Sequence, residues 1–157
     1  MNQLKDIPVV VTHGAENPDA VPASIIAILH EISNHLHNLL NDETTALIDL
    51  MGFLSSPERE ALKTILGEGE VSVTLDTLGQ SLIHETLIPG VWWVQHLNSD
   101  NEPTSENIEI TRIPAILISD TADIREGLNA LNGQLEELAT ELKTTGEQED
   151  EQRRHTG

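Results

Sequence analysis

Two glutamates placed two residues apart are the side chains in this sequence with the clearest capacity for chemistry. Glu68 and Glu70 belong to the motif Gly67-Glu68-Gly69-Glu70, so on an extended backbone both carboxylates share one face. If the next apolar run pairs with this one, Glu85 can join them. Three carboxylates could hold a hard cation or perform acid–base work. Two solvated glutamates between flexible glycines are the simpler interpretation, and they need no ligand.

The rest of the sequence contains no recognisable catalytic motif and no histidine pair spaced to bind a metal ion. The chain has seven histidines, but His30 and His37 are separated by about 10.5 Å of helical rise, too far for one ion. His35 and His37 point to nearly opposite sides of the same helix. The sequence contains no Gly-x-Ser-x-Gly elbow and no Gly-x-x-x-x-Gly-Lys loop. No cofactor and no enzymatic activity are therefore predicted.

Trp92 and Trp93 are adjacent in a predicted strand, so their side chains must face opposite sides of the sheet. One of them could enter the core while the other stands exposed as a protein-binding anchor. Alternatively, both are buried. The sequence leaves these two interpretations open.

Composition narrows the class of protein. The 157 residues suffice for one domain, and zero cysteines exclude disulfides, thiolate zinc sites and Cys-ligated clusters. A formal net charge of −19 opposes binding to nucleic acids and to anionic membranes. Neither a membrane-spanning run nor a secretory signal is expected, and a cytoplasmic protein is predicted.

A meander of three antiparallel strands over residues 66–94 would position the glutamates and tryptophans. Val71, Val73 and Leu75 alternate with polar residues, and the breaks at Gly79 and at Pro89-Gly90 separate the following runs. Helices are predicted over residues 22–40 and 55–66, with a short strand over 45–50 between them. A fourth strand holds Ile108 and Ile110. A final helix, begun by Ser119-Asp120, carries an apolar stripe of Ile124, Leu128, Leu131, Leu135, Leu138 and Leu142.

This order of elements predicts an α+β fold. It is a two-layer domain, with an antiparallel sheet of about four to five strands packed against about three helices. Residues 1–21 are expected to form an extended arm and residues 22–142 a single domain. Residues 143–157 lack apolar side chains and are expected to form a disordered acidic tail.

The central motifs together resemble a known family. The segment from Leu66 to Val71, the pair Glu85-Thr86 and the run Pro89-Gly90-Val91-Trp92 resemble the conserved domain of hydrogenase expression/formation proteins of the HupH/HyaF type. Supporting segments are Leu29-His30-Glu31-Ile32, Ile48-Asp49-Leu50 and Ile113-Pro114. The resemblance extends over about residues 25 to 142. Many family members are about twice this length, so the chain looks like a single copy of the domain.

The resemblance implies a non-enzymatic accessory role in making [NiFe]-hydrogenase. Family members are thought to act on the iron–sulfur small subunit before it joins the large one, often beside a thioredoxin-like accessory protein. The implied partner-binding residues are Gly67, Glu68, Gly69, Glu70, Glu85, Pro89, Gly90, Val91, Trp92 and Trp93.

Two alternatives remain beside this function. One is a metal-binding protein or enzyme that uses Glu68, Glu70 and Glu85. The other is a homodimeric interaction module built from a sheet edge or from the leucine-striped final helix.

Overall fold

The computed structural model describes residues 20–76 and 79–154, without the side chains of 145–153. The chain divides into two compact units, residues 1–112 and residues 113–157. The extended arm predicted for residues 1–21 falls almost wholly outside the described residues.

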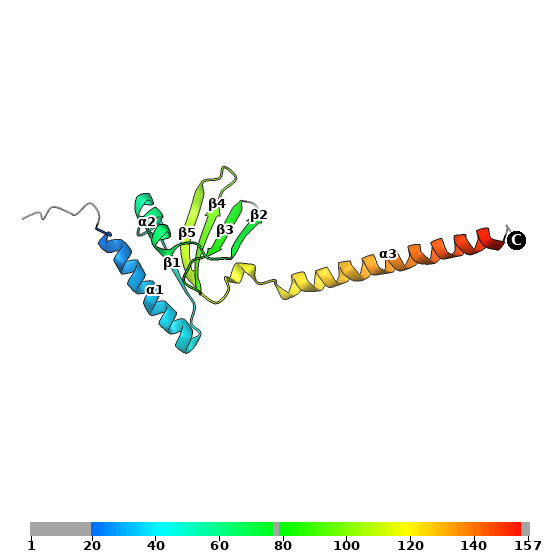
Figure 1. Cartoon of the computed structure of the whole chain (residues 1–157), viewed down its shortest axis with the longest axis horizontal. Helices are drawn as coiled ribbons and strands as arrows, with labels where there is room; N and C mark the ends of the chain where they lie inside the picture. The colour runs from blue at the N-terminus through cyan, green and yellow to red at the C-terminus, as the bar shows by residue number, and fades with distance from the viewer. Residues whose placement is uncertain (1–19, 77–78, 155–157) are drawn as a thin grey trace, which may run out of the picture. The chain divides into compact units, whose positions relative to one another are not determined.

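The first unit is a five-stranded antiparallel sheet with two helices on one side (Figure 1). Along the chain its elements are α1 (Ala23–Asp42), β1 (Ala46–Asp49), α2 (Ser56–Leu66), β2 (Ser72–Asp76), β3 (Gln80–Glu85), β4 (Val91–Leu97) and β5 (Pro103–Ile110). The strands lie in the order β1-β5-β4-β3-β2, so β2, β3 and β4 form the predicted meander. The two-layer α+β fold is confirmed.

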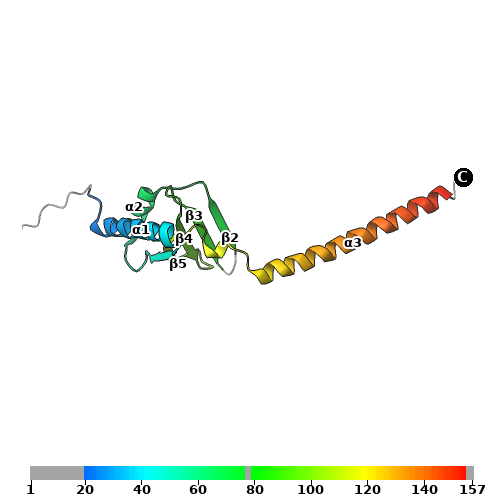
Figure 2. The same ribbon diagram turned by 90° about the horizontal axis from the view of Figure 1, so that it is seen from below.

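The hydrophobic core lies between the two helices and the sheet face that they cover (Figure 2). On that face, Trp93 of β4 lies directly opposite Ile108 of β5, which in turn lies opposite Ile48 of β1. With one phenylalanine and two tryptophans in the chain, aliphatic side chains must fill most of this space. The core comprises Ile25, Ile28, Ile32, Leu39, Ile48, Leu50, Leu54, Leu62, Leu66, Val91, Trp93, Ile108 and Ile110.

Local signals fix both ends of α2. Ser55 and Glu58 form a capping box, and Pro57 lies in the first turn, where its missing N–H costs nothing. Gly67 ends the helix with φ of 67°, a conformation that favours glycine. The hydroxyl of Ser24 also donates to Glu58, so the same carboxylate joins the start of α1 to the start of α2.

The second unit contains the 3₁₀ helix η1 (Ala115–Leu117) and the long helix α3 (Thr121–Arg154). The predicted disorder beyond residue 142 is wrong for residues 143–154, because α3 continues through them. Those residues include Lys, Glu, Gln and Arg, which are good helix formers, and no proline. The absence of apolar side chains argues against a packed core but does not prevent a solvated helix. None of the described helices combines the length and apolarity needed to cross a membrane.

Candidate partner-binding surface

Main-chain hydrogen bonds hold the glutamate-containing segment that follows α2 against the end of β3. The N–H of Gly69 donates to the carbonyl of Glu85 at 2.7 Å, and the N–H of Glu85 donates to the carbonyl of Val71 at 2.8 Å. One step further, the N–H of Leu87 donates to the carbonyl of Leu66 at 3.1 Å. These bonds set the backbone that presents Glu68 and Glu70.

Close backbone approach explains the second glycine of the motif. A Cβ at Gly69 would lie 2.6 Å from the carbonyl oxygen of Thr86 and 3.0 Å from that of Glu85. No other residue fits there without displacing the main chain. Gly67 and Gly69 therefore have structural roles, and any binding chemistry of the motif falls to the glutamates.

Glu68 and Glu70 are both exposed. Burial lowers the pKa of the neighbouring His84 below 6.5, and the positive charge of Lys63 lowers it further, whereas the carboxylate of Glu68 acts in the opposite direction. An open hollow of about 300 Å³ lies beside them, lined by Glu60, Lys63, Thr64, Gly67 and Glu68. Charges of both signs thus line this hollow.

The three-carboxylate alternative has no geometric support. Over residues 20–76 and 79–154, no group of three or more His, Asp or Glu side chains lies close enough together to hold a metal ion. Glu68, Glu70 and Glu85 all belong to those ranges. Although the backbone brings Glu85 beside Gly69, the three carboxylates do not converge.

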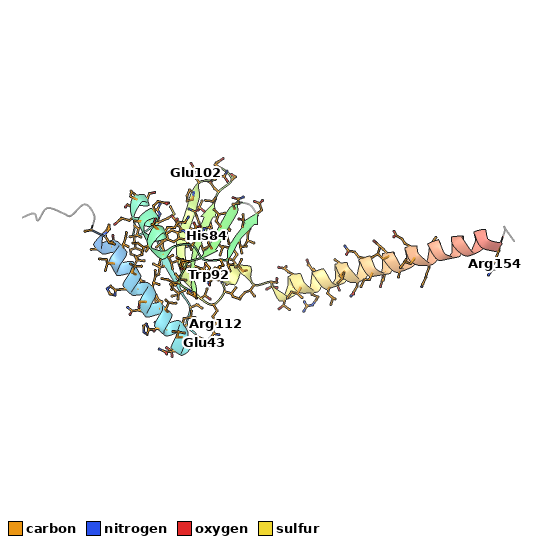
Figure 3. All side chains as sticks on the ribbon, viewed as in Figure 1. Glu43, His84, Trp92, Glu102, Arg112 and Arg154 are labelled. Atoms are coloured by element: carbon orange, nitrogen blue, oxygen red, sulfur yellow. The ribbon has the colours of Figure 1, made fainter. Side chains whose placement is uncertain are left out.

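Both tryptophans are buried, at 5% exposure for Trp92 and 2% for Trp93, so neither is an exposed anchor. They lie on β4, which is paired on both sides, and Val91 beside them is fully buried. The indole N–H of Trp92 (Figure 3) donates to the carbonyl of Thr111 at 3.1 Å. That of Trp93 donates to Oε1 of Glu106 at 3.0 Å. Since both indoles are hydrogen-bonded inside the protein, their roles are structural.

The sequence reasoning missed a polar network beneath α2. Nε of Arg59 donates to Oε2 of Glu106 at 2.6 Å, and the Arg59 guanidinium also donates to the carbonyl of Leu54 at 2.8 Å. The ammonium of Lys63 lies 6.0 Å from the ring centre of Trp93, a cation–π distance. The network joins α2 to the two central strands and so positions the segment that follows α2. Glu106 keeps the two-residue spacing of Ile108 and Ile110, a signal that could have predicted an inward-facing carboxylate.

The turn between β3 and β4 supplies apolar side chains at the same place. Leu87 is 69% exposed and Ile88 is 38% exposed, and the main chain of Ile88 is hydrogen-bonded to the hydroxyl of Thr86. A Cβ at Gly67 would lie 2.5 Å from Cδ1 of Leu87, so the turn lies against the glutamate segment. Together these residues form what we name the acidic–apolar surface: Glu68, Glu70, Leu87, Ile88 and Pro89.

The fold is that of the hydrogenase expression proteins. Residues 23–138 match the family of the HupH hydrogenase expression protein, C-terminal conserved region, and the chain belongs to this family. The solved structure of the hydrogenase expression protein HupH from Thiobacillus denitrificans ATCC 25259 is similar. It superposes with a TM-score of 0.68 at 37% identity, covering 75% of this chain and 99% of that one.

Two curated relatives from Azotobacter show the same similarity. The hydrogenase expression/formation protein HoxQ of Azotobacter vinelandii is 28% identical over 107 residues, which is 68% of this chain and 38% of the relative. HupQ of Azotobacter chroococcum mcd 1 is 27% identical over 107 residues and 37% of its length. The chain thus spans less than two fifths of the length of these curated relatives.

Proposed function

We propose that this chain is a non-enzymatic accessory protein of [NiFe]-hydrogenase maturation. It binds the iron–sulfur small subunit in the cytoplasm before that subunit joins the large one. The observation that carries the proposal is the acidic–apolar surface, because its glutamates and turn belong to the segments that resemble the family signature and are exposed on a fixed backbone.

The chemistry of this surface suits protein recognition. Leu87 offers an exposed apolar side chain of the kind that fills a partner's pocket, and Glu68 and Glu70 can pair with basic side chains around that pocket. Because the backbone is already held by main-chain bonds, binding loses little conformational entropy. The main chain of Val91 is hydrogen-bonded to Thr86 and Ile88 of the turn, and the buried side chains of Val91, Trp92 and Trp93 make no contact with the partner.

The absence of cysteine favours the same role. A chain with no thiol supplies none of the thiolate ligands that hold iron–sulfur clusters, yet it can cover the subunit that carries the cluster. A thioredoxin-like accessory protein is a second partner in this proposal, acting on the same immature subunit.

The experiment compares capture of the small-subunit precursor by the tagged wild-type chain and by Leu87→Ser and Glu68→Gln/Glu70→Gln variants. Loss of an interface anchor worth about 1.4 kcal/mol weakens capture about tenfold. Leu47→Ser is the matched control, since Leu47 is 60% exposed on β1, which β5 and β4 separate from β3. Equal capture by Leu87→Ser and Leu47→Ser would show that the acidic–apolar surface does not bind the precursor.

The maturation role itself is tested in a strain that lacks the protein, grown with and without oxygen. Hydrogenase activity and small-subunit processing should fall, most strongly under oxygen, and should recover with the wild type and with Leu47→Ser. Unchanged activity and processing in both conditions would contradict the role.

A further inference from the structure

Helix α3 carries a continuous apolar stripe that is exposed along its length. The six stripe residues recur at alternating intervals of four and three, and each is between 52% and 75% exposed. They are Ile124, Leu128, Leu131, Leu135, Leu138 and Leu142. An apolar row of this length on a chain that is otherwise strongly acidic calls for a partner surface.

The stripe consists of only two rows of side chains along the helix. The positions that flank it are polar, charged or small, namely Arg125, Gly127, Asn132, Gln134, Ala139 and Glu141. By contrast, α1 packs on the sheet with a wider face, because Leu29 and Leu36 join the buried Ile25, Ile28 and Ile32. A helix that covers a sheet needs the wider apolar face. An apolar stripe of only two rows has the width of the seam between two helices of a coiled coil.

The spacing of the stripe also specifies a helix as the occupant. Intervals of four and three average 3.5 residues, the period that keeps a seam facing a second helix in a coiled coil. The other two α-helices of the described residues, α1 and α2, already pack apolar residues into the core under the sheet. The helix that offers a matching narrow seam is α3 of a second copy.

The charge distribution on α3 permits this pairing even though each chain has a net charge of −19. Asp123, Glu126, Glu136 and Glu137 occupy positions away from the stripe and its flanks. The flanks hold one basic and one acidic residue, Arg125 and Glu141, so two seams can meet without like-charge repulsion along their length.

We infer that two copies of this chain associate through α3 as a coiled coil seamed by Ile124, Leu128, Leu131, Leu135, Leu138 and Leu142. Association also accounts for a helix this long with Gly127 and Gly133 in its interior, because each glycine weakens an isolated helix. The inference concerns self-association and stands whether or not the chain serves hydrogenase maturation.

The first test is the mass of the full chain in solution, measured by light scattering or sedimentation over a range of concentrations. The wild type should have twice the mass of the 17.2 kDa chain, and Leu131→Glu/Leu138→Glu should have the mass of one chain. The matched control, Asn129→Glu/Thr140→Glu, adds the same charge at outer positions of α3 and should remain dimeric. A wild type that has the mass of one chain at every concentration would overturn the inference.

A second test does not depend on the folding of the charged variants. Because the chain has no cysteine, a single introduced thiol reports one contact. Leu131→Cys should form a disulfide with itself if the helices run parallel, or with Leu135→Cys in a mixed sample if they run antiparallel about Gly133. Thr140→Cys, on the outer side, is the control and should not cross-link. Failure of both seam combinations to cross-link above this control would contradict the inference.

Discussion

Nε of Arg59 lies 2.6 Å from Oε2 of Glu106, and this ion pair fastens α2 to β5 with side chains that are 15% and 7% exposed. The other carboxylate oxygen accepts the indole N–H of Trp93. Among the described residues, no buried side-chain nitrogen or oxygen lacks a hydrogen-bond partner. A buried charge in this position is stable because every part of it is paired.

Removing one partner of that pair should destabilise the protein strongly. Arg59→Ala should lower the free energy of unfolding by about 3 kcal/mol, because Glu106 would keep a buried charge without its cation. The measurement is urea unfolding. Arg112→Ala is the matched control, since Arg112 pairs with Glu43 at 3.1 Å with side chains 74% and 77% exposed (Figure 3). That change should cost less than about 1 kcal/mol, and equal losses for both variants would contradict the assignment.

Adding one methyl group at Gly69 should disturb the segment that carries the glutamates. The Cβ of Gly69→Ala would meet the main chain of Thr86 at 2.6 Å, so the free energy of unfolding should fall by about 1–3 kcal/mol. Gly133→Ala on α3 meets nothing within 4 Å and should instead stabilise its helix by up to about 1 kcal/mol. Thermal unfolding of the two variants should therefore shift in opposite directions, and a neutral Gly69→Ala would show that the backbone there can yield.

Acid should weaken the contact between the starts of α1 and α2. Hydrogen bonds from the hydroxyls of Ser24 and Ser55, and then from the Ser55 main chain, lower the pKa of Glu58 from 4.5 to about 2. Since the folded-state pKa lies below the unfolded one, the stability it adds is present at neutral pH and is lost between about pH 5 and pH 2. The thermal midpoint of Glu58→Gln should thus lie below that of the wild type at neutral pH and approach it near pH 2. A Glu58 carboxyl that titrates near 4.5 by NMR would contradict this arrangement.

The pKa of His84 should report where Glu68 lies. Lys63→Met should raise this pKa by removing a repelling cation, and Glu68→Gln should lower it further by removing an attracting anion. Because the folded-state pKa is below the unfolded value of 6.5, the stability associated with neutral His84 is present above that pH and declines below it. NMR titration of the imidazole measures both effects. Glu70→Gln removes the same charge from the other side of Gly69 and should change the pKa of His84 less than Glu68→Gln does. Equal changes from the two variants would contradict the position of Glu68 beside His84.

Most of the elements could be predicted from local patterns. The capping box at Ser55, the alternation at Val73 and Leu75, and the breaks at Pro89 and Gly90 each act within a few residues, and each is present in the structure. The strand predicted to hold Ile108 and Ile110 begins at Pro103, earlier than its apolar residues indicate. The first half of this strand is polar, so period-two hydrophobicity could not reveal it.

The candidate surface was harder to predict because it depends on strand order. Whether Trp92 or Leu87 is exposed follows from β4 lying between β3 and β5, and the sequence does not specify that arrangement. Likewise, the spacing of Leu131 and Leu135 predicts a striped helix but cannot say whether the stripe is covered within the chain. The glycines of the motif were assigned to partner binding, although close backbone contact explains Gly69 and a positive φ explains Gly67.

The pairing of β1 with β5 has a consequence for the order in which the chain folds. Strands β2 to β5 pair with their neighbours in sequence. By contrast, β1 pairs with β5, so Ala46 can pair with Ile110 only after β5 has been synthesised. Closing so long a loop is entropically costly, so local hairpins form before it. During synthesis on the ribosome, α1 and α2 therefore emerge before the sheet that covers their apolar faces. Chaperone demand should be greatest in that interval and should end when β5 closes the sheet.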